Sequence, residues 1–175
     1  IYGDDTNAIP FSFMDSTTNP ASHKYKTLDA ARDAANPADV IIVYPGNYTA
    51  LANLYKNGVT YYFYPGTDVT CAIARFNELF VVTGDGDTCS VYGYANLHNT
   101  FVSGGGSAYV IASLFAGTLN VYCNNISAYG NAIYHQDGFV KVFVLGTVTV
   151  TNDNGTVSLQ NSTGTGNTFE LVADI

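Results

Sequence analysis

The stretch that decides the fold covers residues 26–48 and reads KTLDAARDAANPADVIIVYPGNY. Thr27 is a suitable N-cap, and alanines then recur on one face of a helix. Pro37 ends this helix, because the residue before a proline is kept out of helical backbone angles. The sequence therefore predicts a short helix over residues 26–36. Its face of small side chains must pack on the apolar strand Val40–Tyr44 that follows.

A repeat of about twenty residues follows this opening. Val40–Tyr44 ends in Pro-Gly, and a second Tyr-Pro-Gly ends the run Tyr61–Tyr64, one repeat further along. Further β-forming runs bounded by Gly, Asn or Asp lie at 79–84, 99–104, 117–122, 140–144, 147–151, 156–159 and 169–172. A fixed period of this length is typical of solenoid folds.

The kind of solenoid follows from what the repeats contain. Leucine-rich repeats need a Leu/Asn consensus and helical repeats need helices, and neither pattern is present. Parallel strands are buried along their length, which matches apolar runs without strict alternation. We predict an all-β chain forming a single-stranded parallel β-helix of about seven turns, with the helix 26–36 capping its N-terminal end. Residues 1–25 would be an extended lead-in and 26–175 the β-helix domain. An antiparallel β-sandwich is the alternative fold.

Composition narrows the classes of partner. The 175 residues are 47% hydrophobic and only 11% charged, and the net charge is −8 with a pI near 4.4. Nucleic-acid binding needs a basic surface, so no nucleic-acid partner is expected. No run approaches the ~18 apolar residues of a membrane-spanning helix, so no membrane insertion is expected. The chain begins at Ile1 rather than Met, which indicates a processed product or a fragment.

The three cysteines are Cys71, Cys89 and Cys123. No Cys-x-x-Cys pair is present, which removes the common zinc and thioredoxin-type signatures. A bridge between Cys71 and Cys89 would require them to lie on neighbouring turns. Buried thiols in a β core are the favoured interpretation.

Residues 26–48 resemble the opening of right-handed parallel β-helix proteins of the pectin-lyase-like superfamily. In that superfamily a T-[IL]-x-x-A-x-x-A helix precedes G/D-x-I-x-V-x-P-G-x-Y, and both patterns match here. Gly3–Asn7 is also similar to the D-G-T-N lead-in of surface and phage members. The resemblance covers less than a third of the chain and implies a right-handed coil. It assigns no activity, because the same opening occurs on lyases, hydrolases, esterases, epimerases, adhesins and tail spikes.

The active sites of enzymatic members do not transfer to this sequence. Gly46–Ala50 lacks the Glu of the methylesterase motif G-x-Y-x-E, and no Gln-Asp-Thr follows. Asn152–Asn154 departs from the polygalacturonase N-x-D pattern. A lyase needs an arginine base beside an aspartate cluster, and the only arginines are Arg32 and Arg75. We therefore expect no catalytic residue, and the chain leans towards a non-enzyme.

Asp85 and Asp87, in the sequence Gly-Asp-Gly-Asp-Thr, are the acidic pair closest together in a turn-like setting. Two carboxylates facing one another could hydrolyse a glycosidic bond or hold a calcium ion, the one cofactor considered. The same residues are also ordinary turn formers. They are the candidate metal ligands.

The three histidines, His23, His98 and His135, are far apart in sequence. Neighbouring turns could bring His98 or Asn99 near His135, which leaves a Ser-His-Asp triad open. No G-x-S-x-G elbow accompanies them, and surface or groove histidines are the simpler interpretation.

Tyrosine is the most informative residue type, with 14 Tyr and no Trp. Alternation along a strand places Tyr62 and Tyr64 on one face and Tyr61 on the other. Tyr92 and Tyr94 repeat the pattern on a later run. A tyrosine ring stacks on sugars and its hydroxyl bonds to theirs, so the candidate ligand-binding residues are Tyr62, Tyr64, Tyr92 and Tyr94.

Three functions remain open. The first is a non-catalytic structural or attachment module of a virion spike, fibre or other surface protein, located outside the cell or on the virion. Resemblance to tail spikes implies a homotrimer, and outward tyrosines would supply its contacts and touch cell-surface glycans. The second is a polysaccharide lyase or glycoside hydrolase with a truncated or atypical active site. The third is a glycan-binding module without chemistry.

Overall fold

The computed structural model describes residues 25–71, 79–99, 109–129, 131–150 and 168–174. One helix and thirteen strands lie in this part of the chain, and all registered strand pairs are parallel. The elements are α1 (Leu28–Ala34), β1 (Val40–Val43), β2 (Gly46–Ala50), β3 (Val59–Phe63), β4 (Thr67–Cys71), β5 (Phe80–Val82), β6 (Thr88–Gly93), β7 (Asn96–Asn99), β8 (Tyr109–Ser113), β9 (Thr118–Cys123), β10 (Asn125–Ala128), β11 (Asn131–His135), β12 (Phe139–Val150) and β13 (Thr168–Asp174).

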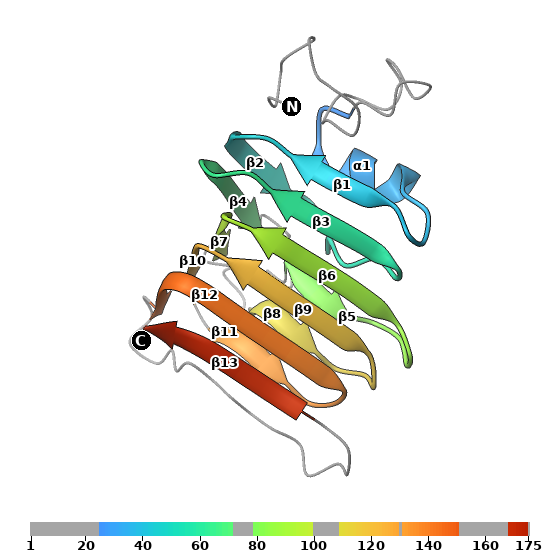
Figure 1. The fold of residues 1–175 in the computed structure, drawn as a ribbon, viewed down its shortest axis with the longest axis vertical. Coiled ribbons are helices and arrows are strands. Elements are labelled where there is room, and N and C mark those ends of the chain that lie inside the picture. The colour runs from blue at the N-terminus through green and yellow to red at the C-terminus, as the bar shows by residue number, and fades with distance from the viewer. Residues whose placement is uncertain (1–24, 72–78, 100–108, 130, 151–167, 175) are drawn as a thin grey trace.

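Ten strands form one sheet that curls through 279°, in the order β1-β3-β6-β9-β12-β10-β7-β4-β2, with β13 also paired to β12 (Figure 1). We call β1, β3, β6, β9, the first half of β12 and β13 arm A. Arm B is β2, β4, β7, β10 and the second half of β12. The remaining strands, β5, β8 and β11, make a separate three-stranded sheet, sheet C. The predicted fold class is confirmed: the chain is an all-β parallel coil with one short helix ahead of its first strand.

The levels of the coil are unequally spaced in sequence. Val40 on β1 is aligned with Thr60 on β3, whereas Val59 on β3 is aligned with Cys89 on β6. The sequence distance between aligned residues is therefore half as long again from β3 to β6 as it is from β1 to β3. The prediction of a uniform period is therefore wrong, because connections between strands can change length without disturbing the lateral pairing. A uniform period places the run 79–84 next to β3, yet β5 belongs to sheet C and the neighbour of β3 is β6.

Six strands stack in arm A of the described chain, where the repeat predicts about seven turns. The run predicted at 156–159 lies outside the described residues, as do the run at 99–104 apart from Asn99 and the lead-in before Tyr25. The described runs at 117–122 and 169–172 fall in β9 and β13 as expected. Those at 140–144 and 147–151 join into the single strand β12 over their described part.

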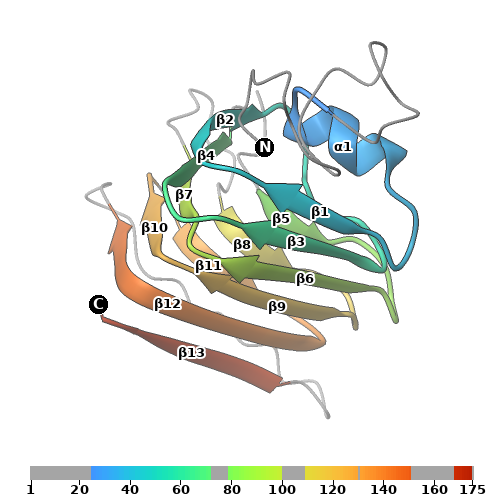
Figure 2. The ribbon, with the colours of Figure 1, turned by 45° about the horizontal axis from the view of Figure 1, so that its top comes forward.

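The helix α1 has the predicted N-cap but is shorter than the predicted range 26–36, since it covers only Leu28–Ala34. Thr27 Oγ1 accepts a hydrogen bond from the Ala30 N–H at 3.2 Å, and the backbone turns extended at Ala35, ahead of Pro37. Leu28 and Ala31 are buried, and α1 lies across the end of the coil above β1 (Figure 2). At seven residues α1 cannot cross a bilayer, and the described part of the chain holds no helix that could.

A network of polar side chains fastens α1 to the coil. The Asp29 carboxylate accepts hydrogen bonds from the N–H groups of Leu51 and Ala52, both at 3.0 Å. The Arg32 guanidinium donates to the Asn53 carbonyl at 2.6 Å. Lys56 Nζ donates to the carbonyl of Arg32 at 2.8 Å. Each of these hydrogen bonds joins a residue of α1 to a residue of the coil. The helix is therefore held over the first levels of the coil by hydrogen bonds as well as by apolar burial.

The core consists of the inward side chains of the strands. Tyr61, Phe63 and Phe80 are fully buried, and the Tyr61 hydroxyl donates to the Leu54 carbonyl at 2.5 Å. The rings of Tyr61 and Phe80 meet edge to face at 5.5 Å, a favoured aromatic geometry. This contact ties β3 of arm A to β5 of sheet C across the coil.

The cysteines lie in this core and form no disulfide, so the Cys71–Cys89 bridge does not exist. Burial raises the pKa of the Cys89 and Cys123 thiols to about 12. The expectation of buried thiols is confirmed, and at neutral pH these groups remain protonated.

Candidate functional site

The outer face of arm A carries an aromatic side chain on each of four consecutive levels. These are Tyr62 on β3, Tyr92 on β6, Tyr122 on β9 and Phe143 on β12, strands that lie side by side in Figure 1. Strand alternation explains their direction: in β3 the burial alternates, with Tyr61 at 0% exposure and Tyr62 at 42%. We call the following set the aromatic strip: Tyr44, Tyr62, Tyr64, Tyr92, Tyr94, Tyr122 and Phe143.

The rings of the strip stack on one another along the coil axis. Tyr92 and Tyr122 have ring centroids 5.3 Å apart, and Tyr122 and Phe143 5.9 Å apart with planes at 28°. Tyr44 and Tyr64 are nearly parallel at 4.8 Å. In this row Tyr122 has a ring neighbour on both sides, Tyr92 and Phe143, whereas Tyr92 has one. The ring contacts therefore cover part of the ring surface of the strip and leave the rest exposed.

All four tyrosines predicted as ligand-binding residues are on this surface. Tyr62, Tyr64, Tyr92 and Tyr94 are between 38% and 46% exposed. Whether they bind a ligand remains a prediction. Tyr94 differs from the other three, because its ring makes no ring contact within the described residues.

Sequence reasoning missed three members of the strip, Tyr44, Tyr122 and Phe143. The signal for Tyr122 is present: Tyr62, Tyr92 and Tyr122 recur at one constant interval, the spacing of these levels in arm A. A search at a fixed interval of about twenty residues passes over it. Phe143 is aligned with Tyr122 on the neighbouring strand. It follows Tyr122 after a smaller interval in sequence, because the level from β9 to β12 is shorter than the one before it.

A polar row borders the strip on arm A. Thr60, Ser90, Asn120 and Lys141 are aligned on successive strands, two residues before the aromatic row. Lys141 Nζ forms an exposed ion pair with Glu170 at 2.9 Å, and this hydrogen-bonded pair raises the pKa of Lys141. The charges of Lys141 on β12 and Glu170 on β13 therefore offset each other next to the strip.

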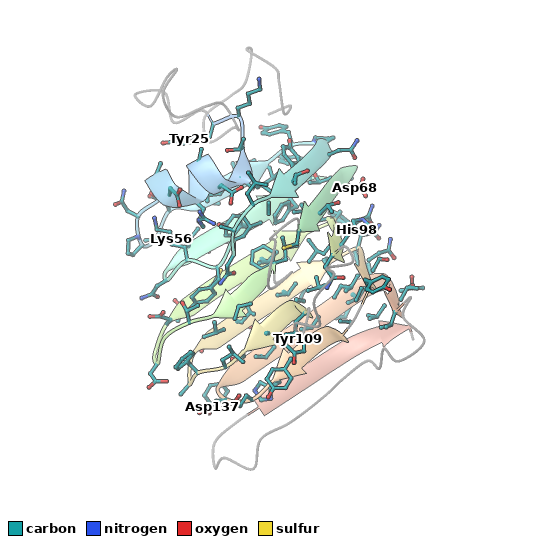
Figure 3. The ribbon with its side chains drawn as sticks, turned by 180° about the vertical axis from the view of Figure 1, so that it is seen from behind. Tyr25, Lys56, Asp68, His98, Tyr109 and Asp137 are labelled. Atoms are coloured by element: carbon teal, nitrogen blue, oxygen red, sulfur yellow. The ribbon has the colours of Figure 1, made fainter. Side chains whose placement is uncertain are left out.

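Arm B presents a face of opposite character. Asp68 accepts hydrogen bonds from Asn96 Nδ2 at 3.0 Å and from the ring of His98 at 3.2 Å. Asn125 Nδ2 donates in turn to Asn96 at 2.9 Å, so the row is linked from level to level. Asp68 and His98 are labelled close to one another in Figure 3, which views the coil from behind Figure 1. The polar groups of this row largely satisfy one another, which is the behaviour of a structural ladder.

The candidate metal ligands, Asp85 and Asp87, lie in the turn between β5 and β6. Asp85 Oδ1 accepts a hydrogen bond from the Ala116 N–H at 3.0 Å. Burial and, after it, the nearby Asp87 carboxylate raise the pKa of Tyr55. No group of three or more His, Cys, Asp or Glu side chains comes together within the described ranges. Asp85 thus has a structural role in joining this turn to the segment before β9, and calcium binding remains a prediction.

The histidines are not brought together. His98 lies on β7 in arm B, whereas His135 lies on β11 in sheet C and is buried, with Nε2 donating to the Gly138 carbonyl at 3.1 Å. His23 lies outside the described residues. The partner of His98 is Asp68, at the surface, rather than His135.

The aromatic strip is therefore the candidate site. It is an exposed apolar surface on a stiff support, and contiguous apolar surface of this kind marks interaction sites on proteins. Comparisons with protein-family models, with curated proteins and with solved structures find no match to the chain.

Proposed function

We propose that the chain is a non-catalytic structural and attachment module of a surface protein such as a virion spike or fibre. It would act outside the cell or on the virion surface. The observation that carries this proposal is the aromatic strip, which places an outward aromatic side chain on four neighbouring levels of a parallel coil and brings the rings of the last three into contact. The resemblance of residues 26–48 to the pectin-lyase-like superfamily, which includes tail spikes and adhesins, supports the same role.

The strip suits contact with further copies of the chain, and we propose a homotrimer. Interface cores are depleted of charge and enriched in Tyr and Phe, as this surface is. The stacked rings are already held in place by their neighbours, so little side-chain entropy is lost on binding. Uncharged contacts are also needed because each copy carries a net charge of −8.

Tyr94 supports a second element of this function, contact with cell-surface glycans. It is 46% exposed, and its ring has no aromatic neighbour in the described chain. A free ring face is what packs against the C–H groups of a sugar. We expect Tyr94→Ala to weaken binding to a glycan array at least tenfold and to leave self-association unchanged. Equal glycan binding by both proteins would contradict this assignment.

Self-association is tested by a charge placed in the strip. Tyr92→Lys puts an ammonium group in the middle of the stacked row, and desolvating it in an interface would weaken association by about a hundredfold or more. We expect sedimentation velocity to show a trimer for the wild-type chain and a monomer for Tyr92→Lys.

The matched control is Thr149→Lys, which adds the same charge to an exposed position on arm B. It should remain trimeric. Both variants change outward side chains, so circular dichroism should show both of them folded. A wild-type monomer at tens of micromolar would contradict the proposal, and so would equal loss of assembly in both variants.

A further inference from the structure

Another pair of stacked tyrosines lies outside the aromatic strip, in sheet C. The ring centroids of Tyr109, on β8, and Tyr134, on β11, are 4.8 Å apart with planes at 28°. The two strands are parallel neighbours, and both side chains are partly exposed. Figure 3 shows Tyr109 on the side of the coil opposite to the view of Figure 1. Two phenols that are distant in sequence are thus held in contact across two levels of the coil.

Contacting phenols can be joined by oxidation. Removal of one electron and one proton from each hydroxyl gives two phenoxyl radicals, whose ortho carbons form a C–C bond. The hydrogen on each of these carbons then moves to the oxygen of its own ring, which becomes an aromatic phenol again. A haem peroxidase supplies the oxidant: one hydrogen peroxide accepts the two electrons and two protons and leaves as two waters. The protein product, dityrosine, is lighter by two hydrogens.

Two features of the structure favour this reaction at Tyr109 and Tyr134. Holding the reacting rings in contact makes coupling effectively unimolecular, so it competes well with loss of either radical. The Tyr134 hydroxyl lies at the exposed surface, where it donates to Gln136 Oε1 at 3.4 Å and can release its proton to water. The cysteines provide no alternative link, because all three are buried and form no disulfide.

We propose that Tyr109 and Tyr134 are a site of oxidative cross-linking, at which a peroxidase-type oxidant joins adjacent levels of the coil through dityrosine. In the unfolded chain, the link closes the loop that runs from β8 to β11. As with a disulfide, a closed loop lowers the entropy of the unfolded state and so stabilises the folded one. A surface module would gain resistance to unfolding without a disulfide.

The test uses the whole chain at low micromolar concentration with hydrogen peroxide and a haem peroxidase. We expect blue dityrosine fluorescence on a species that runs as a single chain in denaturing electrophoresis, with a yield independent of protein concentration. Peptide mapping should find Tyr109 joined to Tyr134. The cross-linked protein should melt about 5 °C or more above the untreated protein.

Variants identify the site. Tyr109→Phe keeps the ring and its stacking but cannot form a phenoxyl radical, so it should lower the yield of the cross-linked peptide pair that contains Tyr134 at least tenfold. The control Tyr94→Phe removes an exposed tyrosine that has no ring partner in the described chain, and it should retain the cross-link. A product that is only intermolecular would overturn the proposal, as would an unchanged yield in Tyr109→Phe.

This inference is independent of self-association through the strip. The Tyr92→Lys variant is expected to be monomeric and should still form the Tyr109–Tyr134 link. Failure of assembly and failure of cross-linking are therefore separate results.

Discussion

Replacing Gly93 by alanine is expected to lower the free energy of unfolding by about 4 kcal/mol, measured by urea denaturation. Gly93 ends β6 with a φ of +119°, a conformation that side chains rarely adopt. A Cβ at this position would also collide with the carbonyl oxygen of Phe63 on the adjacent strand. One of the two strands would have to move, and Tyr92 and Tyr94 lie on either side of the collision.

Gly86 provides the matched control. It also has a positive φ, +76°, but a Cβ there would have nothing within 4 Å. Gly86→Ala should therefore cost only the backbone strain, about 1 kcal/mol. Equal losses in the two variants would show that levels β3 and β6 are not packed as closely as described.

Asn53→Leu is expected to lower the free energy of unfolding by about 3 kcal/mol. The Asn53 amide pairs with the backbone of Val81 on β5 as a neighbouring strand would. Its Nδ2 donates to the Val81 carbonyl at 2.9 Å, and its Oδ1 accepts from the N–H groups of Val81 and Tyr55, both at 3.0 Å. Leucine fills a similar volume but leaves these three partly buried groups without partners. The change should be seen in thermal or urea denaturation.

Asn53→Asp separates the hydrogen bonds from the shape of the side chain. A carboxylate can accept from both N–H groups but cannot donate to the Val81 carbonyl, so we expect about half the loss seen with leucine. If Asn53→Leu lowered the free energy of unfolding no more than Asn53→Asp does, the hydrogen bonds of the amide to the edge of β5 would not contribute to stability.

The cap and the first level could be predicted from sequence because their signals are local. Thr27, the alanine face and Pro37 define α1, and Val40–Val43 is an apolar run ended by a turn. The directions of Tyr61 and Tyr62 could also be predicted, because alternation in a strand depends on the backbone alone.

The length of each level could not be predicted in the same way. Whether an apolar run such as Phe80–Val82 belongs to arm A or to sheet C depends on the connections before it, which carry no periodic signal. The stacking within the strip depends on that register, since Tyr122 contacts Phe143 only because the level from β9 to β12 is shorter than the one before it. The hydrogen bonds of Asn53 to Val81 likewise join distant residues that no local pattern relates.

Stacking also changes how the tyrosines should be interpreted. From sequence alone, four outward tyrosines suggest ring faces open to sugars. Because Tyr92 lies against Tyr122 and Tyr64 against Tyr44, one face of each of these two rings is already covered. Our proposal therefore assigns protein contacts to the strip and sugar stacking to Tyr94 at its margin.

The most direct test of this account is disulfide trapping between levels of the coil. Thr60 and Ser90 are aligned on β3 and β6, and Asn120 is aligned with Ser90 on β9, one level further along. Adjacent levels are ~4.8 Å apart and within disulfide reach, whereas two levels are not. The three native thiols should not react, because they are buried and burial raises the pKa of Cys89 and Cys123 to about 12. Mild oxidation should link the pair Thr60→Cys and Ser90→Cys within one chain, and should leave Thr60→Cys and Asn120→Cys unlinked. Linkage of the second pair, or none in the first, would contradict the parallel coil and the aromatic strip that depends on it.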